Sequence, residues 1–71
     1  MNISLEAARV NANLSKKEVA RHIKVTERTI FNWEKGISSP SILQYVELCK
    51  LYNAKIDDII LPNSLQNVDI Q

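Results

Sequence analysis

The side chains of Glu27, Arg28 and Asn32 can form directed hydrogen bonds, and helical spacing would bring them onto one surface. Arginine donates two parallel hydrogen bonds to guanine, asparagine pairs with adenine, and glutamate accepts a hydrogen bond from cytosine. Phe31 adds an apolar ring, which could touch a thymine methyl group, lie in a contact between chains, or pack half-buried. These residue types therefore favour a surface that reads the edges of DNA bases.

The same side chains also have a simpler interpretation as surface residues. Charged and polar side chains are mostly exposed to solvent in folded proteins, whatever the function. Glu27 could serve only to place a negative charge at the start of a helix. The placement of these side chains on the folded chain decides between the two interpretations.

The sequence contains no group of residues with the spacing of an active site or a metal site. His22 and Cys49 are the only histidine and cysteine, which is too few for a structural zinc site or an internal disulfide. With one glycine, the chain has no glycine-rich phosphate loop. We expect no enzyme activity, no metal and no cofactor, with Cys49 buried and His22 exposed or weakly paired.

Basic residues are concentrated around the candidate base-reading side chains. The 71 residues have a net charge of +1, but the segment 16–35 has six basic and three acidic side chains, a net of +3. The remaining residues therefore sum to −2. This asymmetry favours a polyanionic partner on one face, although in so short a chain it could also arise by chance.

Two short helices joined by a tight turn are predicted to position this surface. Ser15 followed by Glu18 is a capping box that begins a helix at Lys16, and the apolar pattern of this helix stops near Lys24. Thr26 can cap the next helix. The residues expected to point inward are Val19, Ala20, Ile23, Val25, Ile30 and Trp33.

The inward residues determine how the two helices cross. Ala20 is small enough for the crossing point, as a helix-turn-helix requires. With Ile30 and Trp33 turned inward, the opposite face of the second helix points to solvent. That face holds Arg28, Phe31, Asn32 and Lys35.

The rest of the chain predicts further helices, so the expected fold class is all-α with five helices. A first helix runs over residues 4–12 and ends at Asn13, a fourth runs over 41–52 and ends at Asn53, and a short fifth lies within 56–60. The fourth helix begins with a second capping box, of the form Ser-x-x-Gln. Its inward stripe is expected to be Ile42, Tyr45, Leu48, Cys49 and Tyr52.

The length of the chain allows a single domain. We expect this domain to span residues 1–62, followed by a polar tail over 63–71 that could be disordered or could join a partner. No apolar run approaches the roughly 20 residues that cross a bilayer, and the N-terminus lacks the pattern of a signal peptide. We therefore expect a cytoplasmic protein without a membrane partner.

The run LSKKEVARHIKVTERTIFNWEKG, residues 14–36, resembles the helix-turn-helix of the Cro/CI repressor family. Leu5, Arg9 and the stretch SSPSILQYVELCKLYNAKIDDII are similar to the family's other helices. The resemblance implies a five-helix DNA-binding domain that binds a palindromic operator as a homodimer, usually as a repressor. The short chain is most similar to a stand-alone Cro-like, phage-type regulator. Because the family includes antitoxins, a toxin or another regulator is a possible protein partner.

The resemblance also implies roles for individual residues. The family's base-reading positions correspond to Glu27, Arg28 and Asn32, with Phe31 beside them. Further residues are expected to contact the DNA backbone, from the start of the first helix of the motif to the loop after the second. These are Lys16, Lys17, Thr29, Lys35, Ser38 and Ser39.

Three further expectations concern the support of this surface. Arg9 and Glu34 correspond to a structural ion pair of the family. Lys24 occupies a turn position where relatives commonly have glycine, so a positive φ there would cost about 1 kcal/mol. The last segment has more apolar residues than a short helix can bury, which suggests a dimer contact. Its candidate residues are Ile56, Ile59, Ile60 and Leu61.

Overall fold

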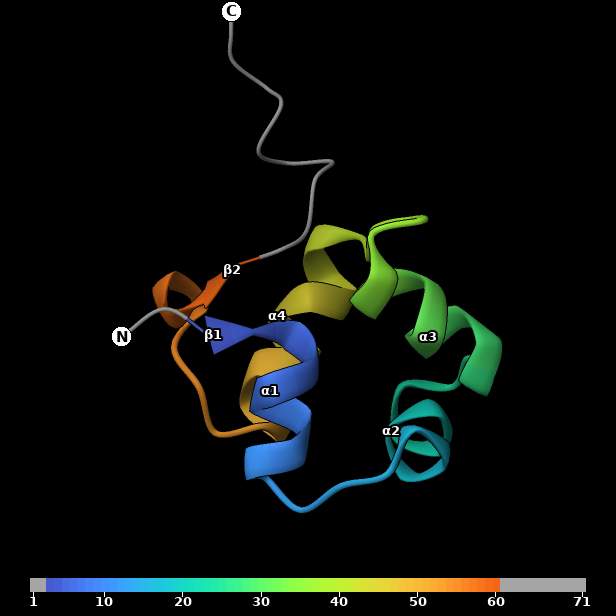
Figure 1. The fold of residues 1–71 in the computed structure, drawn as a ribbon, viewed down its shortest axis with the longest axis horizontal. Coiled ribbons are helices and arrows are strands. Elements are labelled where there is room, and N and C mark those ends of the chain that lie inside the picture. The colour runs from blue at the N-terminus through green and yellow to red at the C-terminus, as the bar shows by residue number, and fades with distance from the viewer. Residues whose placement is uncertain (1–2, 61–71) are drawn as a thin grey trace, which may run out of the picture.

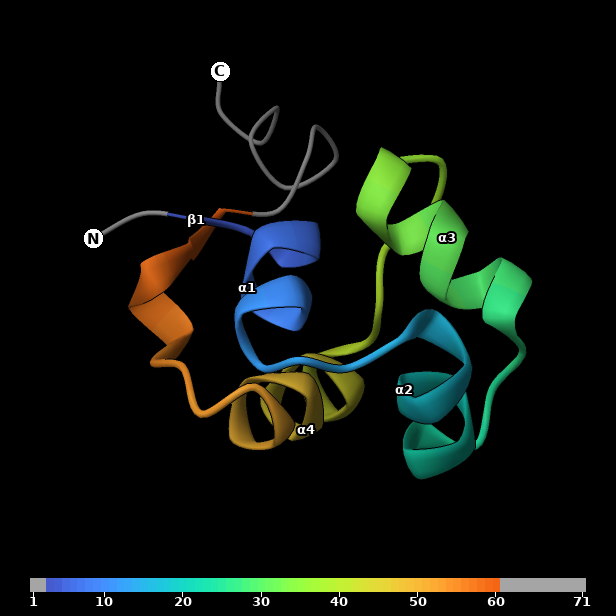
Figure 2. The ribbon, with the colours of Figure 1, turned by 60° about the horizontal axis from the view of Figure 1, so that its bottom comes forward.

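Four α-helices and a short strand pair make up residues 3–60, the part of the chain that the computed structural model describes (Figure 1). Figure 2 shows α2 and α3 together on one side of α1 and α4. The expected all-α class is confirmed, and none of the described helices is long and apolar enough to cross a membrane. In chain order the elements are β1 (Ile3–Ser4), α1 (Leu5–Asn11), α2 (Lys16–Ile23), α3 (Glu27–Lys35), α4 (Ile42–Leu51), the 3-10 helix η1 (Ile56–Asp58) and β2 (Ile59–Ile60).

Side-chain caps begin the helices where the sequence predicts them. The Ser15 hydroxyl accepts a hydrogen bond from the backbone N–H of Glu18 at 3.1 Å, and the Glu18 carboxylate accepts one from the N–H of Ser15 at 2.8 Å. Ser41 and Gln44 form the same reciprocal pair at α4, and the Thr26 side chain caps α3. These bonds satisfy backbone donors that have no partner within a helix, so short helices can begin at defined residues.

Residues with left-handed backbone angles end or follow the helices. Asn13 has φ 61°, Lys24 φ 67°, Gly36 φ 78° and Asn53 φ 55°. Glycine and asparagine tolerate this region better than other residues, because its cost comes from contacts of the Cβ atom. The predicted stops at Asn13, Gly36 and Asn53 are confirmed. Lys24 is the residue whose type does not suit its conformation.

One hydrophobic core joins the four helices. Each helix supplies one of the largest fully buried side chains, which are Leu5, Val19, Ile30 and Leu48. The predicted inward positions of α2 and α3 are therefore confirmed at the centre of the molecule. The other buried apolar residues are Ala8, Ala20, Trp33, Cys49, Tyr52 and Ile59.

The expected fifth helix is wrong: the segment 56–60 is a single 3-10 turn followed by a strand. β2 pairs in parallel with β1, with Ile3 opposite Ile59. The Tyr45 hydroxyl donates a hydrogen bond to the Ile56 carbonyl at 2.7 Å, and the Ile59 carbonyl lies 3.3 Å from it. The extended backbone of Ile59 suits the β-branched residue and returns the chain to the start of α1.

Ile59 is also corrected as a dimer contact, because only 7% of its surface is exposed and its side chain belongs to the protein's own core. Ile56 remains exposed, at 51%. The side chain of Ile60, all of Leu61 and the expected tail 63–71 lie outside the described residues. Of the four candidates for a dimer contact, Ile56 is the one that is described and accessible.

The first turn of α4 differs from its predicted inward stripe. Ile42 is 81% exposed and Leu43 78%, so the expectation that Ile42 points inward is wrong. Leu48 and Tyr52 are buried as expected, and Tyr45 is half-buried. The amino end of α4 extends past the core, which leaves its first-turn apolar side chains on the surface.

Candidate nucleic-acid interface

The turn between α2 and α3 is held by its backbone and by the core. The N–H of Val25 donates to the carbonyl of Ala20 at 2.9 Å, and Ala20 is only 4% exposed. Ile30 and Trp33 on α3 are 1% and 4% exposed and belong to the same cluster. The chain therefore breaks at Lys24 into two separate helices, as predicted. The face of α3 opposite Ile30 and Trp33 is left for other contacts.

This outer face of α3 carries the candidate base-reading residues. Glu27 and Arg28 are exposed, while Phe31 and Asn32 are half-buried. None of the four belongs to the buried core. The side chains that can hydrogen-bond to bases are thus accessible from solvent, on a helix whose other face is anchored.

Arg28, Phe31 and Lys35 form a stripe along α3, which we call the cationic stripe. The Arg28 guanidinium carbon lies 4.9 Å from the centre of the Phe31 ring, and the Lys35 ammonium nitrogen lies 5.8 Å from it. Both cations are within the range of attraction to an aromatic face. Sequence reasoning left the role of Phe31 open, and the ring proves to be flanked by both cations.

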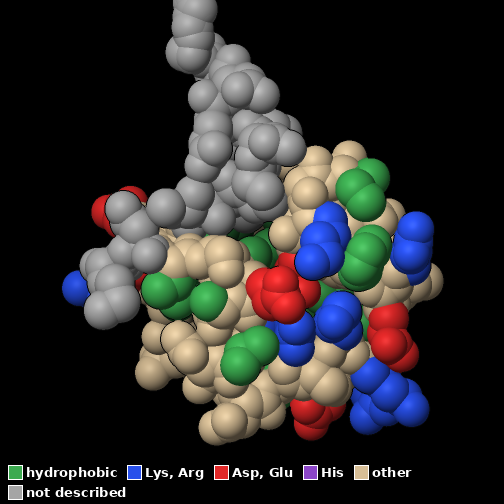
Figure 3. All heavy atoms as spheres, in the orientation of Figure 1, with side chains coloured by type: hydrophobic (Ala, Val, Ile, Leu, Met, Phe, Trp, Pro, Cys, Tyr) green, Lys and Arg blue, Asp and Glu red, His purple; other side chains and the backbone are tan. Residues whose placement is uncertain are grey.

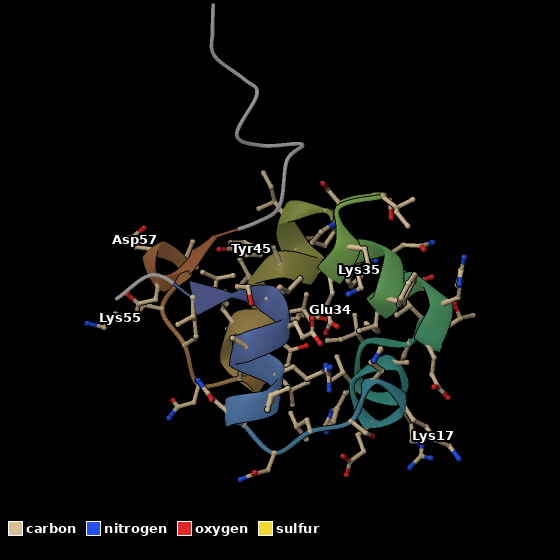
Figure 4. The ribbon with its side chains drawn as sticks, in the orientation of Figure 1. Lys17, Glu34, Lys35, Tyr45, Lys55 and Asp57 are labelled. Atoms are coloured by element: carbon tan, nitrogen blue, oxygen red, sulfur yellow. The ribbon has the colours of Figure 1, made fainter. Side chains whose placement is uncertain are left out.

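Basic side chains gather on the part of the surface formed by α2 and α3 (Figure 3). Figure 4 places Lys17 on α2 and Lys35 on α3 in this half, while Lys55 and Asp57 lie at the opposite end of the molecule. Lys17 is exposed and Lys16 is half-buried, both in the first turn of α2. The charge asymmetry seen in the sequence is therefore also an asymmetry in space.

The loop after α3 is anchored to that helix. The N–H groups of Ile37 and Ser38 lie 2.9 and 3.4 Å from the Asn32 carbonyl, to which both donate. Ser38 and Ser39 are exposed. The two serines are thus held next to the carboxyl end of α3.

The other expected contact with the DNA backbone, Thr29, lies near the start of α3. It is half-buried, and its hydroxyl lies 2.9 Å from that of Thr26.

A nearly buried ion pair joins α1 to α3. The Arg9 Nε atom donates to the Glu34 carboxylate at 2.7 Å, and the two side chains are 9% and 2% exposed. Figure 4 shows Glu34 between α3 and α1. The hydrogen bond to Glu34 raises the pKa of Arg9 above its ordinary value, so the guanidinium stays charged. The pair that the resemblance implied is present, and it fixes α3 against the first helix.

Two features around this pair were not foreseen from the sequence. Arg9 Nη1 also donates to the Leu14 carbonyl at 2.8 Å, which ties the loop before α2 to α1. Tyr52 is buried, its hydroxyl has no hydrogen-bond partner among the described residues, and burial raises its pKa. A backbone carbonyl carries no sequence signal, so the Leu14 contact is visible only in three dimensions.

Comparison with known proteins gives two matches. Residues 5–59 match the model of a helix-turn-helix family. The chain belongs to this helix-turn-helix family. It is also 31% identical over 61 residues to an uncharacterized HTH-type transcriptional regulator of Archaeoglobus fulgidus, with 86% of each chain covered. No solved structure matches the chain significantly.

Membership in the helix-turn-helix family indicates what the exposed face of α3 binds. The family is of the Cro/CI type and consists of DNA-binding transcription-regulator domains, which is not an enzyme class. The chain is accordingly a DNA-binding protein of the transcription-regulator class. In the helix-turn-helix, the second helix is the one that enters the major groove. That helix is α3, whose outer face carries the cationic stripe.

Proposed function

We propose that the protein is a sequence-specific repressor that binds a palindromic operator as a homodimer, with α3 of each copy in the major groove. The observation that carries the proposal is the two-sided character of α3. Ile30 and Trp33 are almost completely buried, while Glu27 and Arg28 on the other side are exposed. Two copies would place their α3 helices in successive major grooves, about 34 Å apart.

The proposed base contacts come from the outer face of α3. Arg28 donates to guanine and Asn32 pairs with adenine, since these are the preferred partners of the two side chains. Glu27 at the first position of α3 accepts from cytosine, and Phe31 meets an apolar group in the groove. These four side chains determine the sequence of the half-site.

The proposed phosphate contacts surround this face and fix the register of the protein on the duplex. Lys17 is exposed at the start of α2, where helix polarity also favours an anion. Lys35 and the anchored loop extend the contact past the end of α3. The full set is Lys16, Lys17, Thr29, Lys35, Ser38 and Ser39.

The proposed dimer contact uses exposed apolar side chains at the amino end of α4 and on η1. Ile42 and Ile56 are 81% and 51% exposed. Tyr45, one helical turn after Ile42, bonds to the Ile56 carbonyl and so ties the two segments together. We call Ile42 and Ile56 the α4–η1 surface. A second copy would cover these side chains and remove them from water.

The proposal is tested by selecting binding sites from randomised double-stranded DNA. We expect an inverted repeat whose half-sites contain a guanine and an adenine at a fixed spacing. Affinity for the selected site should fall steeply with salt, because each phosphate contact releases counterions. Selection of no consensus, or of a single half-site bound by a monomer, would refute the corresponding part of the proposal.

A second candidate function is a protein-interaction module that binds another regulator or a toxin. The observation in its favour is the set of exposed apolar side chains around the start of α4, which includes Ile37 at 65% exposure. A module of this kind would use that surface in place of the outer face of α3. The same selection experiment separates the two functions, because such a module would yield no salt-sensitive, sequence-specific complex.

A further inference from the structure

The ring of Phe31 lies on the outer face of α3, among side chains that can form hydrogen bonds to bases. Its neighbours along the helix, Arg28 and Lys35, both hold their charged groups against it, at 4.9 and 5.8 Å from the ring centre. Phe31 remains half-buried rather than fully covered. An apolar group is thus presented to solvent between two cations, on the surface proposed to enter the major groove.

We infer that Phe31 is a specificity-determining residue: it reads the 5-methyl group of a pyrimidine in the base pair next to the guanine contacted by Arg28. This inference rests on the proposed function. In the major groove, the apolar feature of a base edge is the methyl group on C5, present in thymine and absent from unmethylated cytosine. The accessible part of the ring therefore has one class of apolar partner among the base edges.

The spacing of the two side chains fits adjacent base pairs. Stacked base pairs are separated by about 3.4 Å along the duplex, so two steps span about 6.8 Å. The 4.9 Å between the Arg28 guanidinium and the Phe31 ring lies between these values. When the guanidinium faces one base pair, the ring therefore lies less than two steps away, within reach of the neighbouring pair. Arg28 and Phe31 together read two successive base pairs, with a guanine in one base pair and a methyl group in the other.

The flanking cations also hold the ring in place. Attraction to the guanidinium and the ammonium favours ring positions that keep Phe31 between Arg28 and Lys35. On the duplex, Lys35 can reach a phosphate while Arg28 reaches the guanine, so the ring is centred between two fixed points. Phe31 therefore contributes contact with the methyl group and also positions Arg28.

The test replaces individual thymines of the selected site with deoxyuridine, which removes the methyl group and leaves every hydrogen bond unchanged. We expect the wild-type protein to bind about fourfold more weakly at one thymine next to the guanine read by Arg28, the factor that burial of one methyl group gives. Placing 5-methylcytosine instead of cytosine at that position should recover a similar factor. Binding is measured by fluorescence anisotropy with the full chain.

Variants assign the effect to the ring. In Phe31→Ala and Phe31→Gln the ratio of thymine to deoxyuridine affinity should fall to about one, and Phe31→Tyr, which keeps the ring, should retain it. Glutamine keeps a long side chain at this half-buried position, so the second variant guards against a loss of packing. Val10→Gln, which changes an exposed apolar side chain on α1, is the matched control and should keep the wild-type ratio.

Three outcomes would overturn the inference. These are equal affinity for thymine and deoxyuridine at every position, a methyl effect that persists in Phe31→Gln, and a selected site with an unmethylated G·C pair on both sides of the guanine. In each case specific, Arg28-dependent binding would remain, so the proposed function would stand. Loss of all sequence preference in the wild-type protein would instead overturn both.

Discussion

The helix-turn-helix, residues 15–36, and the surface made by residues 37–46 with Ile56 use their apolar side chains in different ways. In the first, Val19 and Ile30 are at most 1% exposed, and charged groups cover the outside. In the second, residues 37–46 contain no charged side chain, and Ile37, Ile42, Leu43 and Ile56 are between 51% and 81% exposed.

This difference indicates two kinds of partner. A charged surface with a buried apolar interior suits a polyanion, because its favourable contacts are made with phosphates and base edges. A surface with exposed isoleucines gains most from covering by another apolar surface. The same short chain thus carries one face for DNA and another for protein. The predictions below test each side of this comparison.

The largest expected effect is on the stability of the DNA-binding side. Glu34→Ala leaves the nearly buried Arg9 guanidinium with only the longer contact to the Glu6 carboxylate, at 4.0 Å, which should cost about 3 kcal/mol in the free energy of unfolding. The double variant Arg9→Met, Glu34→Leu should lose less than Glu34→Ala alone, because it removes both charges. Urea unfolding measures both values. A loss in the double variant that exceeds the loss in Glu34→Ala would contradict the assignment of a coupled pair.

The next effect concerns the protein-binding side. Ile42→Ser and Ile56→Ser should each weaken the homodimer by more than about tenfold, since burial of an isoleucine side chain contributes about 1.5 kcal/mol and the substitution is present in both copies. Analytical ultracentrifugation measures the dissociation constant. Val10→Ser, an exposed apolar position on α1, is the matched control and should leave it unchanged. An effect of the same size at Val10 would exclude the α4–η1 surface as the specific contact.

A smaller effect is expected at the turn of the helix-turn-helix. Lys24 has φ 67°, so Lys24→Gly should raise the free energy of unfolding by about 1 kcal/mol and with it the melting temperature. If the Lys24 side chain contacts a phosphate, the same variant should bind DNA slightly more weakly. An unchanged melting temperature would show that the lysine conformation is not strained.

The smallest effect depends on pH and concerns the capping box of α2. The backbone N–H of Ser15 donates to the Glu18 carboxylate and lowers the pKa of Glu18. Because the pKa of Glu18 is lower in the folded state, its ionised carboxylate stabilises the fold at pH values above the unfolded pKa. This stabilisation is lost as the pH falls through the folded pKa. Wild type should therefore melt above Glu18→Gln at pH 7, with the gap closing toward pH 3. A difference in melting temperature that stays constant with pH would show that the Glu18 carboxylate does not stabilise the capping box through its charge.

The helix-turn-helix could be predicted from the sequence because its signals are local. The Ser15–Glu18 box and the stop at Gly36 each involve residues close together in the chain, so spacing alone identifies them. The ion pair of Arg9 and Glu34 spans 25 positions and was implied only by resemblance to a family. Signals between residues close together in the chain therefore predict the helices and most of their inward-facing residues.

The remaining features depend on contacts that local sequence does not show. β2 pairs with β1, more than 50 residues away, and this pairing overrides the weak helical pattern at Ile59. Helical periodicity correctly predicts a stripe along α4 but cannot tell that Ile42 lies beyond the reach of the core. The placement of the Phe31 ring between two cations likewise follows from side-chain conformations, which residue types leave undetermined.

The most direct test of the central claim, that the outer face of α3 reads the DNA sequence, is the affinity of Arg28→Ala for a series of sites. The series contains the selected operator and its single-base-pair variants, measured at constant salt. The account predicts a loss of about 1 to 3 kcal/mol on the operator and relaxed preference at the guanine position alone. Equal weakening on every site, with the guanine preference retained, would make Arg28 a phosphate contact and contradict the account.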